Sequence, residues 1–261
     1  MNRYIVFLKQ VPLSTRVEMD EETKTLKRAS AMTQINPYDL YALQAALDIR
    51  RRAGGEVVAV SMGPASAEEV LREALQRGAD RAVLLSSRAF AGSDTWCTSL
   101  VLAAAARKLG GYTLLLFGRM AIDGDTAQVG PEVAARLGLP QLTALQTVDS
   151  LTADALCATC RVGDTLCRLE AALPCVGVVG KEWGQPDSPT LAGWRRAQQC
   201  PVLRWDEHDL DLSPSEVGLS GSPTRVVSTE VPHRRKDIRW LSGAAALCEA
   251  IKHSLKQKTI N

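Results

Sequence analysis

The feature of this sequence that most constrains its fold is a regular alternation of short apolar runs and longer amphipathic runs over the first half of the chain. Runs such as VVAV at residues 57–60 and LLLF at 114–117 are continuously apolar, which is typical of strands covered on both faces. The segments between them carry apolar residues at helical spacing. Strands are predicted at residues 4–9, 56–62, 81–86 and 113–117, and helices at 38–52, 65–77 and 95–109. This βαβ alternation predicts an α/β fold with an open, mainly parallel sheet and flanking helices.

The second half of the chain predicts additions to this sheet. Strand-like runs at 155–160, 165–171 and 175–179 predict a small strand extension beside the main sheet, and a loop with a helix follows over 184–199. Residues 206–240 are rich in Pro, Ser and charge, and an amphipathic helix over 242–256 has an apolar face that needs a surface to cover. We therefore expect an α/β domain over residues 1–205 and, over residues 206–261, an extended arm and terminal helix that pack on a partner subunit.

Composition and charge exclude several classes of protein. A formal net charge of +2 gives no reason to expect a nucleic-acid partner. The longest apolar stretch, at residues 100–106, is too short to span a bilayer, and the one at 5–8 is too short for a signal-peptide core. We expect a cytoplasmic chain without a membrane span.

The residue types that usually carry catalysis or bind metals form no familiar pattern. Cys157 and Cys160 have the spacing of a redox or zinc pair, but no second pair or histidine is near, and residues three apart in a strand point to opposite faces. Unreactive thiols are the better interpretation. The three histidines are spread over the arm and tail, and no HExxH, GxSxG or GxGxxG motif occurs. We expect no metal site and no catalytic residue.

The segment most informative for function is GRMAIDGDTAQVGP at residues 118–131, which follows a predicted strand and opens a helix. Open α/β sheets bind ligands at the carboxyl ends of their strands. With Pro131 at the first helical position, the N–H groups of residues 126–130 face the positive end of the helix dipole, which attracts phosphate. The alternative is a well-capped helix that binds nothing.

In this segment we expect Thr126, Gln128 and the backbone amides to hold the anion, and Gly130 to permit its close approach. Asp123 and Asp125 are expected to orient the loop or to accept hydrogen bonds from ribose hydroxyls. The predicted ligand contacts are Asp123, Gly124, Asp125, Thr126, Ala127, Gln128, Val129 and Gly130.

Three further strand ends and one helix start are expected at the same edge of the sheet, which together suggest an adenine-nucleotide site. They are FLKQVP at 7–12, SMGP at 61–64, GSDT at 92–95, and Asn36-Pro37, where Asn36 is a natural helix cap. Each one alone is no more than an ordinary turn or cap. The predicted contacts are Phe7, Lys9, Asn36, Asp39, Met62, Asp94 and Thr95.

In combination these motifs resemble the β subunit of electron-transfer flavoproteins. The resemblance rests on KQVP at 9–12, INPYD at 35–39, SMGP at 61–64, RGADRAVLL at 77–85, GRMAIDGDTAQVGPE at 118–132 and GSPTRV at 221–226. It implies an adenine nucleotide bound to this subunit, a larger α subunit as partner, and an FAD framed by the two. The nucleotide is AMP in simple carriers and a second FAD in bifurcating members, which oxidise NADH. The segments IDGDTAQVGP, AGSDTWCTS at 91–99 and GSPTRV are similar in sequence to those of the FAD-binding, bifurcating group.

The same resemblance assigns PTLAGWRR at 189–196 to a loop that docks a partner dehydrogenase, such as an acyl-CoA dehydrogenase. We expect Leu191, Trp194 and Arg195 to form the contact, with Leu191 as an apolar anchor and Arg195 and Arg196 as steering charges. The alternative is a core helix with solvated arginines.

The expected function is that of an electron-transfer flavoprotein β subunit that, with its α subunit, passes electrons between dehydrogenases and an acceptor. One alternative is a stand-alone adenine-nucleotide-binding regulatory module, against which the C-terminal arm and helix argue. Another is an adenylating enzyme, for which the chain shows no cluster of catalytic residues.

Overall fold

The computed structural model describes residues 1–13, 32–227 and 240–258. The strands are β1 (Arg3–Leu8), β2 (Gln10–Pro12), β3 (Thr33–Ile35), β4 (Glu56–Met62), β5 (Arg81–Leu85), β6 (Leu114–Gly118), β7 (Gln141–Leu151), β8 (Ala155–Val162), β9 (Thr165–Ala172), β10 (Cys175–Val179) and β11 (Val202–Trp205). The helices are α1 (Pro37–Ala53), α2 (Glu68–Arg77), α3 (Thr95–Leu109), α4 (Val129–Leu137), α5 (Leu191–Gln199), α6 (Gly218–Gly221) and α7 (Gly243–Lys258), with 3-10 turns η2 (Ala65–Ala67), η3 (Arg88–Phe90) and η4 (Lys181–Trp183).

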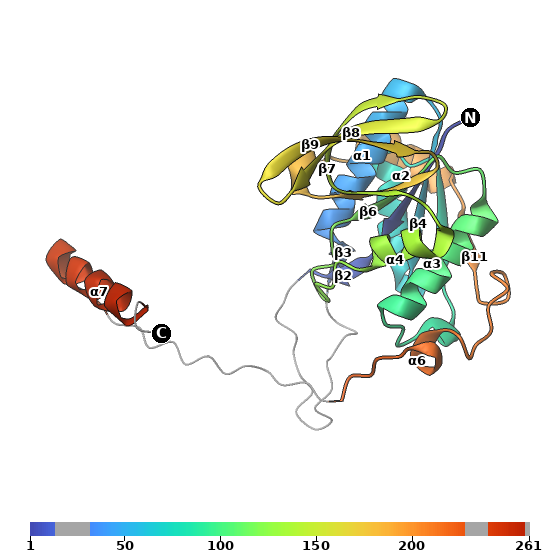
Figure 1. Cartoon of the computed structure of the whole chain (residues 1–261). Coiled ribbons are helices and arrows are strands. Elements are labelled where there is room, and N and C mark those ends of the chain that lie inside the picture. Colours follow the sequence, from blue (N-terminus) through green and yellow to red (C-terminus); the bar gives the residue numbers. More distant parts are fainter. Residues whose placement is uncertain (14–31, 228–239, 259–261) are drawn as a thin grey trace. The chain divides into compact units, whose positions relative to one another are not determined.

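Nine strands form one sheet in the order β11-β5-β4-β1-β6-β10-β7-β8-β9 (Figure 1). Every pair from β11 to β7 is parallel, whereas β7-β8 and β8-β9 are antiparallel. The predicted α/β class with a mainly parallel sheet is confirmed. A separate two-stranded sheet joins β2 to β3.

One predicted strand occupies a different position in the sheet from the expected one. The run at 175–179 was expected in the side extension, but β10 lies between β6 and β7 inside the parallel sheet. All five of its residues are buried, as a strand covered on both faces requires. Strands β7 and β11 were not predicted, because the apolar residues of β7 recur without a regular period of two and β11 has only four residues.

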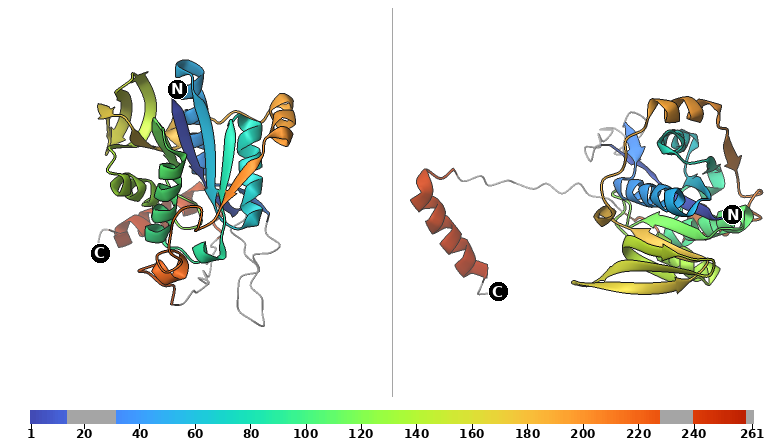
Figure 2. Two further views of the ribbon diagram at one scale, coloured as in Figure 1. Left: turned by 90° about the vertical axis from the view of Figure 1, so that its right-hand side faces the viewer. Right: turned by 90° about the horizontal axis from the view of Figure 1, so that it is seen from above.

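Helices cover the two faces of the sheet (Figure 2). Each face has its own apolar core. Alternate residues of β1 serve the two cores: Val6 packs with the residues of α1 and α2, and Ile5 packs with those of α3 and α4. Each fully buried aliphatic side chain of this kind contributes about 1.5–3 kcal/mol to folding. The two cores hold the strands in place, so the carboxyl ends of the strands form a rigid edge.

The α/β unit continues further along the chain than predicted. The compact unit runs from Met1 to Arg225, whereas the predicted boundary lay at 205/206. The difference arises because Leu210 and Val217 are buried in the core that contains α3. The second unit, Val226–Asn261, contains α7, which matches the helix predicted at 242–256. Predicted arm residues 228–239 lie outside the described residues.

None of the helices that the structure describes is long and apolar enough to cross a membrane.

Candidate functional site

A cavity of about 1270 Å³ opens at the carboxyl ends of β1, β4, β5 and β6, beside the first residues of α3 and α4. This is the edge at which open parallel sheets bind ligands. Most of the predicted contacts line it, namely Phe7, Lys9, Asp39, Met62, Asp94, Thr95, Gly124, Thr126, Ala127, Gln128, Val129 and Gly130. Asn36, Asp123 and Asp125 do not line it. The strand ends and helix starts selected from the sequence therefore meet at one site.

Two aromatic rings form part of the cavity wall. The rings of Phe7 and Phe117 stack with their centroids 4.5 Å apart and their planes 11° apart. Both side chains are nearly buried and belong to the core on the side of α3 and α4. They therefore give the cavity a rigid apolar surface at the ends of β1 and β6.

Asp39 is a buried carboxylate at the wall of the cavity, 6% exposed. Its Oδ2 accepts a hydrogen bond from the backbone N–H of Lys9 at 2.7 Å. Burial raises the pKa of Asp39 to about 7, although hydrogen bonds from Asn36 and from the Lys9 amide favour the charged form. The group at this junction of β1, β6 and α1 therefore titrates near neutral pH.

The raised pKa of Asp39 predicts a specific dependence of stability on pH. Because the pKa in the folded state exceeds the ordinary value of 3.8, the stabilising contribution is present at low pH and is lost as pH rises toward 7. At 1.36 kcal/mol per pKa unit, the change corresponds to at most about 4 kcal/mol. We expect the wild type to lose up to this much free energy of unfolding, relative to Asp39→Asn, between pH 4 and pH 7. Urea denaturation across this range measures it, and parallel pH profiles of the two proteins would contradict it.

Asn36 holds the loop that follows β6. Its Nδ2 donates to the Met120 carbonyl at 2.8 Å, and its Oδ1 accepts from the Ile122 N–H at 3.2 Å. Asn36 occupies the N-cap position of α1 with Pro37 in the first turn, but its side chain makes no capping hydrogen bond. The prediction of a capping side chain was therefore wrong. The amide instead bridges two loops that lie 84 residues apart in sequence.

The loop between β6 and α4 has an unusual backbone. Asp125 and Ala127 adopt left-handed conformations, with φ of 50° and 54°. Such a conformation costs an L-residue about 1–2 kcal/mol and is concentrated at ligand-binding and active sites. Asp123 forms an ion pair with Lys9 at 2.7 Å, which joins the loop to the end of β1. This contact favours the orienting role expected for Asp123.

Helix α4 begins at Val129, two residues before the predicted start. Pro131 still lies in the first turn, where its missing N–H would have had no helical partner. The N–H groups of Val129 and Gly130 lie at the positive end of the helix, and both residues line the cavity.

The structure explains the need for glycine at position 130 by packing, whereas the sequence predicted the close approach of an anion. A Cβ at this position would lie 3.1 Å from Val178 Cγ2 and 3.3 Å from Phe117. Gly130 therefore permits the close packing of α4 on the sheet, and its replacement would disturb the core as well as any ligand.

Two arginines add positive charge to the cavity. Arg88 and Arg119 line it, are exposed, and make no ion pair with any other residue that the structure describes. Neither was selected from the sequence, because a single arginine after a strand carries no distinctive pattern. Together with two helix N-termini they give the cavity a chemistry that suits an anionic ligand.

Thr224 reaches the cavity from the C-terminal segment and was also missed. Asp94 Oδ2 accepts from Thr224 Oγ1 at 2.8 Å and from its N–H at 3.1 Å, while Oδ1 caps α3 through the Cys97 N–H at 3.1 Å. Burial opposes ionisation of Asp94, but these hydrogen bonds keep its pKa below the ordinary value. The end of the α/β unit is thus attached to the rim of the cavity.

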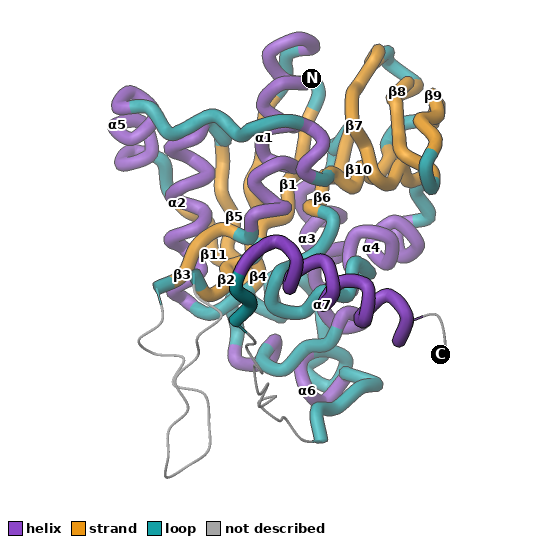
Figure 3. Tube along the Cα trace, turned by 90° about the vertical axis from the view of Figure 1, so that its left-hand side faces the viewer, coloured by secondary structure: helices purple, strands orange, loops and turns teal. Residues whose placement is uncertain are grey.

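The predicted docking residues lie on α5 (Figure 3), and none of them lines the cavity. Leu191 and Trp194 are 68% and 49% exposed, and Arg195 is exposed. The alternative that these side chains belong to a core helix is therefore wrong. Arg196, however, bonds to the carbonyls of Leu75 and Ala79.

The CxxC pair lies as strand geometry predicts. Cys160 faces the core of the sheet, where burial raises the pKa of its thiol, and Cys157 faces the other side. Among the described residues no group of His, Cys, Asp and Glu is arranged to hold a metal ion.

Comparison with known proteins gives consistent matches. The family model described as "Electron transfer flavoprotein domain" matches residues 23–210. The chain is 42% identical to an electron transfer flavoprotein subunit beta of Thermoanaerobacterium thermosaccharolyticum, with 89% of each chain covered. It is 44% identical to Protein FixA of Bradyrhizobium diazoefficiens, over 89% of this chain and 83% of the relative. It is 38% identical to CarD, a subunit of the caffeyl-CoA reductase-Etf complex of Acetobacterium woodii, over 99% of both chains.

Proposed function

This chain belongs to the electron transfer flavoprotein family, and we propose that it is the β subunit of a heterodimer that carries electrons between a dehydrogenase and an acceptor. The observation that carries this proposal is the cavity at the strand ends, where the start of α4 and the side chains of Arg88 and Arg119 converge. The chemistry of such a site suits the phosphates of a nucleotide. The electron transfer itself is chemistry that a bound flavin supplies.

We propose FAD, in preference to AMP, as the nucleotide of this subunit. The cavity of about 1270 Å³ exceeds the range of about 300–1,000 Å³ that is common for drug-sized ligands. The N–H groups of Val129 and Gly130 and the side chains of Thr126 and Gln128 would hold one phosphate, and Arg88 or Arg119 a second. The stacked ring of Phe7 offers an apolar wall to a planar group.

The exposed surfaces and the relatives support the proposed partners. We propose that α7 and the arm before it pack on the α subunit, because Trp240, Leu247 and Ile251 expose 91%, 51% and 50% of their surface. We propose a dehydrogenase that acts on CoA esters, such as an acyl-CoA dehydrogenase, as the protein that docks on α5, since CarD is named as part of a CoA-ester reductase complex. We further propose that NADH is the electron donor and that its two electrons are sent along separate paths.

The direct test is the nucleotide content of the heterodimer, co-expressed with an α subunit from a close relative. We expect two flavins per heterodimer, counted by absorbance and by the mass of the released nucleotides. One flavin together with AMP would replace FAD by AMP in this subunit. A flavin-free chain that does not pair would support the stand-alone regulatory module.

We expect Thr126→Ala to weaken nucleotide binding roughly ten- to hundredfold with the fold retained. The loss of one hydroxyl bond to a charged acceptor costs about 1.5–3 kcal/mol. Thr126 lies on the surface of the loop and lines the cavity, so its truncation leaves the core intact. Equilibrium titration with AMP and with FAD, after removal of bound nucleotide, measures the effect.

Thr165→Ala is the matched control, because Thr165 is exposed on β9 at the far end of the sheet. Equal affinities of the two variants would remove Thr126 from the site.

A further inference from the structure

Helix α5 carries the docking residues on one side and its attachment to the protein on the other. Leu191, Trp194 and Arg195 are spaced i, i+3 and i+4, so they share one side of the helix. Gly193 and Ala197, also four residues apart, share another side, and Ala197 is 1% exposed. The two sides of this short helix therefore have separate roles.

The attached side lies against the end of α2. A Cβ at Gly193 would collide with the carbonyl oxygen of Gln76, so glycine permits the two backbones to touch. At the other end of α5, Arg72 of α2 donates to the Cys200 carbonyl at 2.7 Å and to the Ala197 carbonyl at 3.3 Å. Both ends of α5 thus contact α2, the first through close backbone packing and the second through hydrogen bonds.

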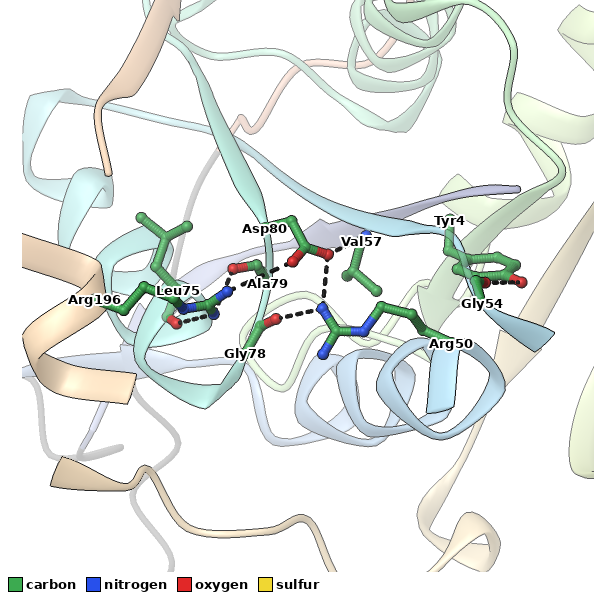
Figure 4. Close-up of polar contacts among 9 residues, drawn as sticks. All are labelled: Tyr4, Arg50, Gly54, Val57, Leu75, Gly78, Ala79, Asp80 and Arg196. Carbon is green, nitrogen blue, oxygen red and sulfur yellow. Dashed lines mark hydrogen bonds and ion pairs between the residues drawn. The ribbon is translucent and has the colours of Figure 1, made fainter. Parts of the chain in front are cut away.

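Between these two ends of α5, Arg196 contacts the end of α2 (Figure 4). Its Nη2 donates to the carbonyls of Leu75 at 3.1 Å and of Ala79 at 2.9 Å. These carbonyls lie in and just beyond the last turn of α2, where an arginine is a favourable cap. The Leu75 carbonyl also accepts from the Gly78 N–H at 3.1 Å, so Arg196 adds a second donor to it. The Arg196 side chain is still 42% exposed, so its guanidinium remains partly solvated while it makes these contacts.

Asp80 connects this contact to the rest of the fold. Its Oδ1 lies 3.5 Å from Arg196 Nη1, and its Oδ2 accepts from Arg50 Nη1 at 2.7 Å and from the Val57 N–H at 2.8 Å. Arg50 also donates to the Gly78 carbonyl at 2.9 Å (Figure 4). The network therefore joins α5 to α1, to β4 and to the end of α2.

We propose that Arg196 is a positioning residue, which holds the docking side of α5 in place and does not itself touch the partner. This inference rests on the proposed docking function of α5. A helix of nine residues has little stability of its own, so its order depends on such contacts. If only a fraction of molecules present an ordered α5, the apparent affinity for the partner falls by that fraction.

The test uses four variants of the complete heterodimer with an acyl-CoA dehydrogenase as the probe. We expect Arg196→Gln to speed amide hydrogen exchange in α5 by about tenfold or more, the equivalent of one lost charge-assisted hydrogen bond. It should raise the KM for the dehydrogenase while the rate at saturating dehydrogenase and the flavin content stay unchanged. Arg196→Lys keeps the charge but lacks the planar guanidinium. Its exchange rate in α5 and its KM should therefore lie between those of the wild type and of Arg196→Gln.

Arg195→Gln is the matched control, because the neighbouring arginine lies on the docking side. It should raise the KM and reduce its dependence on salt, with unchanged exchange in α5. Leu191→Ala should raise the KM alone.

Two results separate the positioning role from the docking function. If Leu191→Ala and Arg195→Gln raise the KM but Arg196→Gln does not, or does so without faster exchange in α5, the positioning role is overturned and docking stands. If neither Leu191→Ala nor Arg195→Gln changes the KM, the docking side is wrong and the role of Arg196 falls with it.

Discussion

A chain that ends at Arg225 should stay folded and lose all pairing with the α subunit. Residues 1–225 form a compact unit with both apolar cores, so the truncation removes no core residue of that unit. The removed part contains α7, whose Leu247 and Ile251 are half exposed and supply the apolar surface of the proposed interface. Co-purification with a tagged α subunit measures pairing, and thermal unfolding of the truncated chain measures its fold.

A cut after residue 205 is the informative contrast. It also removes Leu210 and Val217, which are buried in the core of the α/β unit, so it should destabilise the fold as well as prevent pairing. Retained pairing of the chain that ends at Arg225 would show that the α subunit binds elsewhere. Unfolding of that chain would show that the second unit contributes to the stability of the first.

Gly118→Ala should destabilise the protein by about 3 kcal/mol, the upper end of the usual cost of overpacking a core. A Cβ at Gly118 would lie 2.6 Å from the carbonyl carbon of Tyr38 and 2.7 Å from the nitrogen of Asp39. Both atoms belong to the backbone at the start of α1, so no side-chain rotation relieves the contact. Urea denaturation measures the loss of stability.

The control for Gly118→Ala is Gly124→Ala, in the loop that follows. No atom lies within 4 Å of a Cβ at Gly124 and its φ is not positive, so the change should stay within about 0.5 kcal/mol. Equal stabilities of the two variants would mean that α1 can move away from β6.

The sequence alone was sufficient for the elements that local patterns determine. The buried strands β1, β4, β5 and β6 are continuous apolar runs, and the helices between them repeat apolar residues at helical spacing. Parallel order places the carboxyl ends of these strands at one edge, so the loop after β6 was predicted to belong to a ligand site, and several of its residues line the cavity. These patterns are readable because they act over fewer than about 15 residues.

Tertiary structure alone decided which distant groups meet. Asn36 bridges to Met120 and Asp94 binds Thr224, contacts that span 84 and 130 residues of sequence. The place of β10 inside the sheet and the inward direction of Arg196 likewise depend on which elements become neighbours. The pKa of Asp39 depends on burial, and burial is a property of the packed core. A sequence pattern records the periodicity of one segment, whereas these hydrogen bonds and the desolvation of Asp39 arise only when distant segments pack together.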